Sequence, residues 1–197
     1  MHISDGVLSL EITVVVSVIS LFAMLKAIKE LKNEDISITG VASAMFFIAS
    51  FIHIPFGITQ IHLILLGVIG ILVSWGAFVA IFAALLLQAL LLGYGGIVSI
   101  GVNLFIMAMP AVIVHYIYHT PFIQNLNDKI KFFVVGFLGT FFATLFLTAI
   151  LYFSKEEYNY AAVSIFLLNI ITMIIEGIVS MFLLLFIKKV YPKILKV

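Results

Sequence analysis

Long apolar runs, separated by short polar segments, constrain this chain more than any other feature of its sequence. They cover residues 7–28, 38–56, 62–92, 97–118, 130–153 and 161–187. About 20 apolar residues in a helix cross the hydrocarbon core of a bilayer. Hydrophobic residues make up 64% of the chain and charged residues 10%, whereas soluble domains average roughly 45–50% and about 25%. We therefore expect an all-α, polytopic membrane protein in which residues 1–197 form one integral membrane domain.

The run at residues 62–92 is too long for one upright span. As a single helix it would measure about 45 Å at 1.5 Å per residue, and Ser74-Trp75-Gly76 lies near its middle. Lysines decide the count, because cytoplasmic loops carry an excess of positive charge. They follow both the first and the last span: Lys26, Lys29, Lys32, Lys188, Lys189, Lys193 and Lys196. This pattern places the N-terminus outside and the C-terminus in the cytoplasm, so the number of spans must be odd. Counting the run at residues 62–92 as two helices, with a break at residues 74–76, gives seven transmembrane helices.

Composition also excludes several classes of function. The chain has no cysteine, so disulfides, zinc ribbons and thiol catalysis are excluded. Its formal net charge of +1 argues against a nucleic-acid partner, which requires a basic surface. No positive segment precedes the first apolar run, as a signal peptide would require. If Met1 and His2 have a chemical role, the mature chain must begin at Met1.

The first two residues, Met1 and His2, have the chemistry of a metal chelate. The α-amino group and the deprotonated His2 amide nitrogen would close a five-membered ring, and His2 Nδ1 would close a six-membered ring with that amide. Such a planar nitrogen set suits nickel(II) or copper(II) and suits zinc poorly. His62, expected at the outer end of its helix, is the candidate fourth ligand, since imidazole is a common metal ligand. The alternative is that His2 is an ordinary residue in a frayed terminus.

Four sequence blocks carry a family resemblance. They are MHISDGVL at residues 1–8, GITQIHL at 57–63, LQALLLGYGG at 87–96 and GVN at 101–103. In this order they resemble the CbiM/NikM family, the substrate-binding (S) components of energy-coupling factor (ECF) transporters for cobalt and nickel. The resemblance covers most of the first 110 residues, and the rest matches in hydropathy only. Two positions depart from the family pattern: Gln60, where serine or threonine is frequent, and Tyr94, where histidine is frequent.

The resemblance implies a metal site at Met1, His2 and His62, and a seven-helix fold whose N-terminal segment enters the molecule. It implies that Ni²⁺ or Co²⁺ is a transported substrate, that the chain needs no cofactor, and that it is not an enzyme. The expected partners are membrane lipid, an ECF transmembrane scaffold (T) subunit and ATPase subunits, with a further small membrane subunit left open. The expected location is the cell membrane of a prokaryote.

A metal-independent membrane channel or scaffold is the alternative function. An intramembrane zinc protease would need His-Glu-x-x-His on a helix, and the sequence contains no such motif. The glycine-rich turn at residues 93–96 lacks the following Lys-Ser/Thr of a phosphate-binding loop. ATP is therefore expected to bind to a partner subunit.

Glu176 is the first of four candidates for a supporting role, because a charge within a span is costly and frequently functional. It shares one helix face with Asn169, Thr172 and Ser180. We expect this face to point into the bundle, against Asn103 or Gln88, and to give structural support or conformational coupling.

The other supporting candidates lie near the predicted outer surface. Asn103 belongs to the fourth block, and Asp5 either hydrogen-bonds a ligand imidazole or caps a helix that begins near residue 7. His53 either supports a metal ligand, holds incoming metal briefly, or is a packed side chain. His115 and His119 lie one helical turn apart near the cytoplasmic side, where hydrogen-bonded or solvated histidines are the commoner interpretation and metal release is the alternative.

Overall fold

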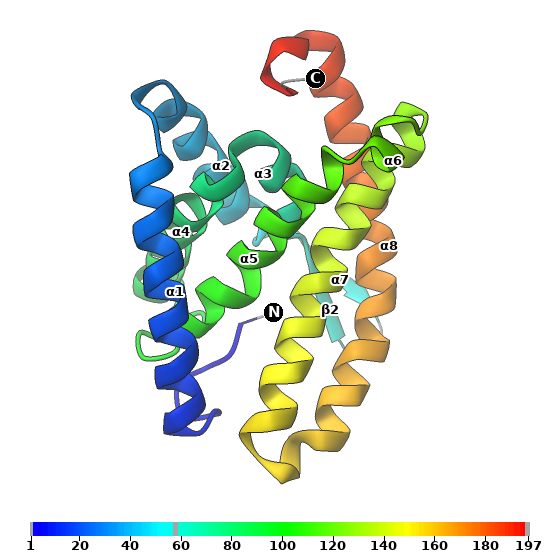
Figure 1. Ribbon diagram of the computed structural model, residues 1–197. Coiled ribbons are helices and arrows are strands. Elements are labelled where there is room, and N and C mark those ends of the chain that lie inside the picture. The colour runs from blue at the N-terminus through cyan, green and yellow to red at the C-terminus, as the bar shows by residue number, and fades with distance from the viewer. Residues whose placement is uncertain (1, 57–58, 196–197) are drawn as a thin grey trace.

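Helices form almost the whole fold of the computed structural model (Figure 1). The structure describes residues 2–56 and 59–195, with the backbone alone for residues 53–61. The helices are α1 (Leu10–Glu30), α2 (Ile36–Ala49), α3 (Leu66–Val73), α4 (Ala77–Leu92), α5 (Ile100–Tyr118), α6 (Pro121–Gln124), α7 (Asp128–Ser154) and α8 (Asn159–Val190). Short 3-10 turns lie at Asn33–Asp35, Ser74–Gly76, Glu156–Tyr158 and Pro192–Leu195.

Within the described residues, five helical stretches are long and apolar enough to cross a membrane. They are Leu10–Glu30, Leu66–Leu92, Ile100–Tyr118, Asp128–Ser154 and Glu156–Val190. The prediction of a multi-pass helical membrane protein is therefore confirmed. The count of seven crossings and the sides of the two termini stay predictions.

The expected break in the long central run is present at Ser74–Gly76. The α-helical backbone ends at Val73 and resumes at Ala77, and Ser74 has a positive φ of 50°. Trp75 anchors this turn, because its indole N–H donates to the Tyr116 hydroxyl at 2.9 Å. Two short helices, α3 and α4, thus replace one helix that would be too long for the bilayer.

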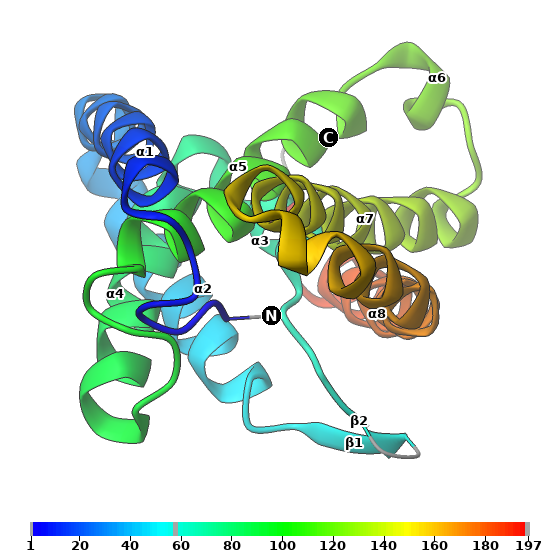
Figure 2. The same cartoon turned by 90° about the horizontal axis from the view of Figure 1, so that it is seen from below.

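One segment differs from the all-helical expectation. Residues 38–56 were expected as a span and His62 as the end of a helix, but α2 ends at Ala49. An antiparallel hairpin follows, with β1 (His53–Phe56) paired to β2 (Thr59–His62) so that His53 is opposite His62. Pro55 accounts for the change, because proline disfavours helical backbone in the residue before it and is tolerated in edge strands. Figure 2 shows the hairpin projecting away from the helices.

The short helix α3 lies at the centre of the packing, against α2, α5 and α7. All of residues 66–72 are buried. A Cβ atom added at Gly67 would overlap the Val135 carbonyl of α7, and one added at Gly70 would overlap the Ala111 carbonyl of α5. Small residues at such crossings let helix backbones approach closely.

Replacing Gly70 with alanine should therefore lower the melting temperature of the purified protein by about 5 °C. Overpacking a tight contact costs about 1–3 kcal/mol, and each kcal/mol corresponds to roughly 2–4 °C in a chain of this size. Gly40→Ala is the matched control, because no atom lies within 4 Å of a Cβ added there. That variant should melt at or above the wild-type temperature, since alanine favours a helix. Equal melting of the two variants would contradict the packing argument.

The chain before α1 turns back into the bundle. Figures 1 and 2 show it running from the start of α1 into the space between α5, α7 and the hairpin. Ser9 marks the turn: its side chain caps α1 by accepting the Ile12 N–H, and its own N–H donates to Ser154 Oγ at 2.8 Å. Asp5 therefore does not cap α1, because the helix begins three residues later than expected and has Ser9 as its cap.

Candidate metal centre

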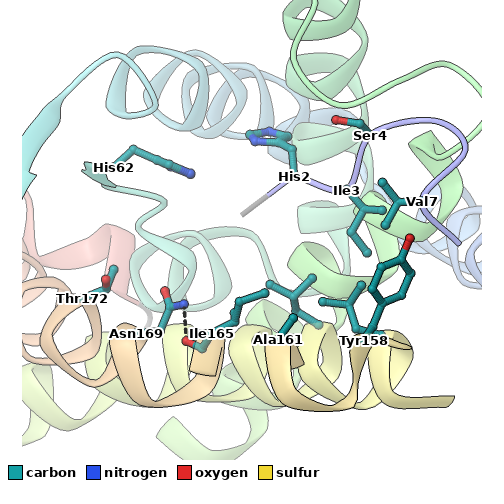
Figure 3. A pocket seen from close by; sticks show the side chains of 12 residues that line it. His2, Ile3, Ser4, Val7, His62, Tyr158, Ala161, Ile165, Asn169 and Thr172 are labelled. Atoms are coloured by element: carbon teal, nitrogen blue, oxygen red, sulfur yellow. Dashed lines mark hydrogen bonds between the residues drawn. The ribbon is translucent and has the colours of Figure 1, made fainter. Parts of the chain in front are cut away.

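His2 and His62 meet inside the bundle, although they are distant in sequence. Their ring centroids are 5.7 Å apart and the ring planes differ by 28°. Figure 3 shows the two side chains facing one another across a cavity, His2 from the N-terminal segment and His62 from the end of β2. Met1, the other predicted ligand, lies outside the described residues. Within residues 2–56 and 59–195, no group of three or more His, Asp or Glu side chains forms a metal cluster.

The distance between the two imidazoles allows them to share one metal ion. With a metal–nitrogen bond of about 2.0–2.1 Å, each ring centroid lies about 3.2 Å from the metal, so two ligand rings lie at most about 6.4 Å apart. The observed 5.7 Å is within this limit. Two histidines leave further coordination positions for backbone nitrogen or water.

Asn103 fixes the N-terminal segment beside this pair. Its Oδ1 accepts the Ile3 N–H at 2.8 Å, and its Nδ2 donates to the Ile3 carbonyl at 2.9 Å. Both residues are buried, with 2% and 4% of their surface exposed. A buried backbone segment outside regular structure needs such partners, so Asn103 determines where His2 lies. Its hydrogen-bond partner is Ile3 of the N-terminal segment, whereas Glu176 was the expected one.

Asp5 forms a second attachment of the same segment. Its Oδ1 accepts the Ser99 N–H at 2.8 Å, and the Ser99 hydroxyl lies 2.8 Å from both that oxygen and the Ile3 carbonyl. Although desolvation opposes ionisation, hydrogen bonds from the Ser99 hydroxyl and the Ser99 and Val98 amides hold the pKa of Asp5 below its usual value. Gly96 leaves room for the carboxylate, which a Cβ there would overlap. Asp5 thus joins the segment to the start of α5, and its partners among the described residues are Ser99 and Val98, not His2.

A polar chain holds His2 itself. His2 Nε2 lies 2.9 Å from Gln88 Oε1, Gln88 Nε2 donates to Ser50 Oγ at 2.8 Å, and the Ser50 hydroxyl donates to the Phe47 carbonyl at 2.6 Å. Burial lowers the pKa of His2 to about 4. The imidazole is therefore neutral at physiological pH, which is the state required of a metal ligand.

This lowered pKa predicts a pH dependence of the metal-free protein. The unfolded chain binds a proton at His2 near pH 6.5 and the folded chain only near pH 4. The unfolded state therefore binds more protons between these values, and stability falls as pH drops through this window. The melting temperature should fall by about 5 °C more between pH 7 and pH 4.5 in the wild type than in His2→Gln. Identical pH profiles would contradict the assignment.

Glu176 fixes the turn that directly follows His62. The Glu176 side chain is fully buried and accepts the backbone N–H groups of Ile64 and Leu65, the latter at 3.1 Å from Oε2. Leu65 has a left-handed conformation, with φ of 53° and ψ of 32°, and directly precedes α3. The predicted inward orientation of Glu176 is confirmed, but its partner is the turn after His62, not Asn103 or Gln88.

A cavity of about 460 Å³ opens beside the two histidines (Figure 3). Asn169 and Thr172, which share the Glu176 face of α8, line one wall. Apolar residues of α7, α8 and the N-terminal segment line much of the remainder. The Asn169 amide donates to the Ile165 carbonyl within its own helix at 2.8 Å. The polar face of α8 therefore both lines the cavity and supports the turn that carries His62.

The other predicted histidines are placed apart from this pair. The backbone of His53 pairs with His62 in the hairpin, and its side chain lies outside the described part. His115 Nδ1 is 3.1 Å from the Gly70 carbonyl, and His119 Nδ1 is 2.8 Å from the His115 carbonyl. These bonds agree with the hydrogen-bonded interpretation of His115 and His119.

Sequence reasoning missed the roles of Gln88, Ser50 and Ser99. Gln88 was considered only as a neighbour of Glu176, yet it is fully buried and contacts His2. The signal was available, because an uncharged polar residue within an apolar span must find a hydrogen-bond partner. Its partner could not be identified, since the fold of the N-terminal segment decides it.

Comparison with known proteins gives the family. The family model described as "CbiM: Cobalt uptake substrate-specific transmembrane region" matches residues 2–194. A Haemophilus influenzae protein named for metal transport is 32% identical over 99% of this chain and 97% of its own length. The Clostridium tetani protein named "Cobalt transport protein CbiM" is 31% identical over 100% of this chain and 88% of its own.

Solved structures agree with this result. A crystal structure of a truncated transition metal transporter superposes with a TM-score of 0.79 and 25% identity, over 96% of this chain and 99% of that one. A second transition metal transporter superposes with a TM-score of 0.81, over 96% of this chain and 93% of the other. The chain therefore belongs to the CbiM family of cobalt-uptake substrate-specific transmembrane proteins, and it is a membrane component of metal transport.

Proposed function

We propose that this chain captures nickel(II) or cobalt(II) as the substrate-binding subunit of an ATP-driven importer of the energy-coupling factor type. The ligands are the Met1 amino nitrogen, the His2 amide nitrogen and Nδ1, and the His62 imidazole. The observation that carries the proposal is that His2, on the docked N-terminal segment, lies beside His62, with ring centroids 5.7 Å apart. A terminus that only frayed would not be fixed by Asn103, Asp5 and Gln88.

Nickel is the favoured ion of the two. Amino, amide and imidazole nitrogens of one Met-His terminus lie in a plane, and planar nitrogen coordination suits nickel(II). Relatives support both ions: one is named for cobalt transport, and an Archaeoglobus fulgidus relative, 30% identical over 74% of this chain, is named as a fused nickel transport protein.

The transport step requires partners, which the proposal assigns to a membrane scaffold subunit and ATPase subunits. The N-terminus would lie outside and the C-terminus in the cytoplasm of a prokaryotic cell. Figure 1 supports this orientation, since the α1–α2 connection and the C-terminal segment, both rich in lysine, lie at one end of the bundle and the α7–α8 turn lies at the other. Positive loops face the cytoplasm.

The test is a metal titration of protein that begins at Met1 and carries its tag at the C-terminus. Nickel should form a one-to-one complex with the visible absorption band of planar nickel–nitrogen coordination. Insertion of one proline between Met1 and His2 should abolish the complex, because proline has no amide hydrogen to lose and so interrupts the adjacent chelate rings from the α-amino group to the imidazole. Insertion of one alanine after Lys32, in the loop before α2, is the control and should leave binding unchanged.

Equal binding by the native protein and the insertion after Met1 would overturn the terminal site. Absence of binding by the native protein would overturn metal capture altogether and favour a metal-independent channel or scaffold.

A further inference from the structure

The polar chain from His2 to α2 has a fixed direction. It begins at His2 Nε2, passes through the Gln88 amide and the Ser50 hydroxyl, and ends at the Phe47 carbonyl in the last turn of α2. A backbone carbonyl only accepts hydrogen bonds. The Ser50 hydrogen therefore points to Phe47, and the free acceptor site of Ser50 Oγ must receive a donor.

This direction determines how the Gln88 amide is oriented. Its NH₂ group must face Ser50, which places Oε1 against His2. Because Oε1 only accepts, the hydrogen between Gln88 and His2 belongs to His2 Nε2. In the opposite orientation Gln88 Oε1 would face Ser50 Oγ, and both atoms would be acceptors because the Ser50 hydrogen points to Phe47. Each buried polar group left unsatisfied costs about 1–3 kcal/mol. Gln88 is fully buried, so water does not replace a lost partner.

We infer that Gln88 is a positioning residue that holds His2 in the Nε2–H tautomer and leaves Nδ1 as the nitrogen with the free lone pair. The inference about the tautomer stands on the hydrogen bonds alone, and its consequence for metal binding rests on the proposed function. Only Nδ1 closes a six-membered ring with the His2 amide nitrogen, so the correct donor is prepared before the metal arrives. A histidine ligand generally needs such a partner on its second nitrogen.

The tautomer is measured directly in metal-free protein labelled with ¹⁵N-histidine, by long-range ¹H–¹⁵N correlation at pH 7.5. The chain has five histidines, and the His2→Gln spectrum assigns the His2 signals. We expect the Nε2–H form in the wild type and a mixture of both tautomers in Gln88→Met, which keeps the side-chain length without the acceptor. Gln88→Glu restores an acceptor and should restore the Nε2–H form. The Nδ1–H form in the wild type would overturn the inference.

Metal affinity gives the second measurement. Gln88→Met should bind nickel about 10- to 100-fold more weakly, whereas Gln88→Glu should remain within about ten-fold of the wild type. Gln124→Met is the matched control, since Gln124 bonds Tyr118 and Lys131 near α6, and it should bind normally. Equal weakening in Gln88→Met and Gln88→Glu would overturn the positioning role, because lost packing alone predicts it. If the wild type binds no metal, the proposed function fails, and the histidine spectrum still decides the tautomer.

Discussion

Glu176→Leu should lower the stability of the purified protein by about 3–5 kcal/mol and weaken metal binding with it. The substitution leaves the N–H groups of Ile64 and Leu65 buried without their acceptor. Each buried donor left unsatisfied costs about 1–3 kcal/mol, and this substitution leaves two of them. Leu65 adds to the effect, because its left-handed backbone is unfavourable for a residue with a Cβ and is held in place by these bonds. The expected melting temperature is about 10 °C lower.

Ser180→Ala is the matched control for this prediction. Ser180 lies one helical turn from Glu176 on the same buried face, and within the described residues its hydroxyl has no hydrogen-bond partner. Its removal should change the melting temperature by less than about 2 °C, since no bond is lost. Glu176→Gln should lie between the two, because one amide oxygen can accept but the NH₂ group cannot. Wild-type melting of Glu176→Leu would show that the contact with Ile64 and Leu65 does not stabilise the fold.

The sequence predicts the helices well because the bilayer imposes one requirement on each of them. An apolar run of sufficient length must be helical, since lipid offers no partner for free backbone groups. The break at Ser74–Gly76 follows from the same length argument and is confirmed. The hairpin at residues 53–62 was missed because the apolar run at residues 38–56 includes its first strand, and Pro55 and Gly57 were local signals against a helix there.

The sequence predicted the candidate ligands but not the contacts that support them. Coordination chemistry pointed to Met1 and His2 from the first two residues and to His62 as a fourth ligand, and the family resemblance implies the same three residues. The contacts of Asp5 and Glu176 depend on how the N-terminal segment and the turn before α3 fold back onto α5 and α8. No periodicity in the sequence specifies such non-local contacts. For that reason the observed contact of Asp5 is neither of the two expected ones, a ligand imidazole or a helix cap, and the partners expected for Glu176 were wrong.

Asn103→Leu should separate the site from the rest of the fold more cleanly than any ligand mutation. Leucine has a similar volume, but it neither accepts the Ile3 N–H nor donates to the Ile3 carbonyl. The docked N-terminal segment then loses about 2–3 kcal/mol, and because only the docked segment binds metal, nickel affinity should fall about 30- to 100-fold. The melting temperature of the metal-free protein should fall by no more than about 5 °C, the same limit as for protonation of His2, since the segment can leave the bundle without unfolding the helices.

Calorimetric titration with nickel and hydrogen exchange of residues 2–9 measure the two parts of this expectation. Faster exchange of the segment together with weaker binding would establish that docking of the segment and metal capture are one equilibrium. Asn103→Asp keeps the acceptor and loses the donor, so its exchange rate and nickel affinity should lie between those of Asn103→Leu and the wild type. Asn125→Leu is the control, because Asn125 is exposed near α6 and should leave both quantities unchanged. Normal affinity in Asn103→Leu would mean that the metal ligands hold the segment in place without this anchor.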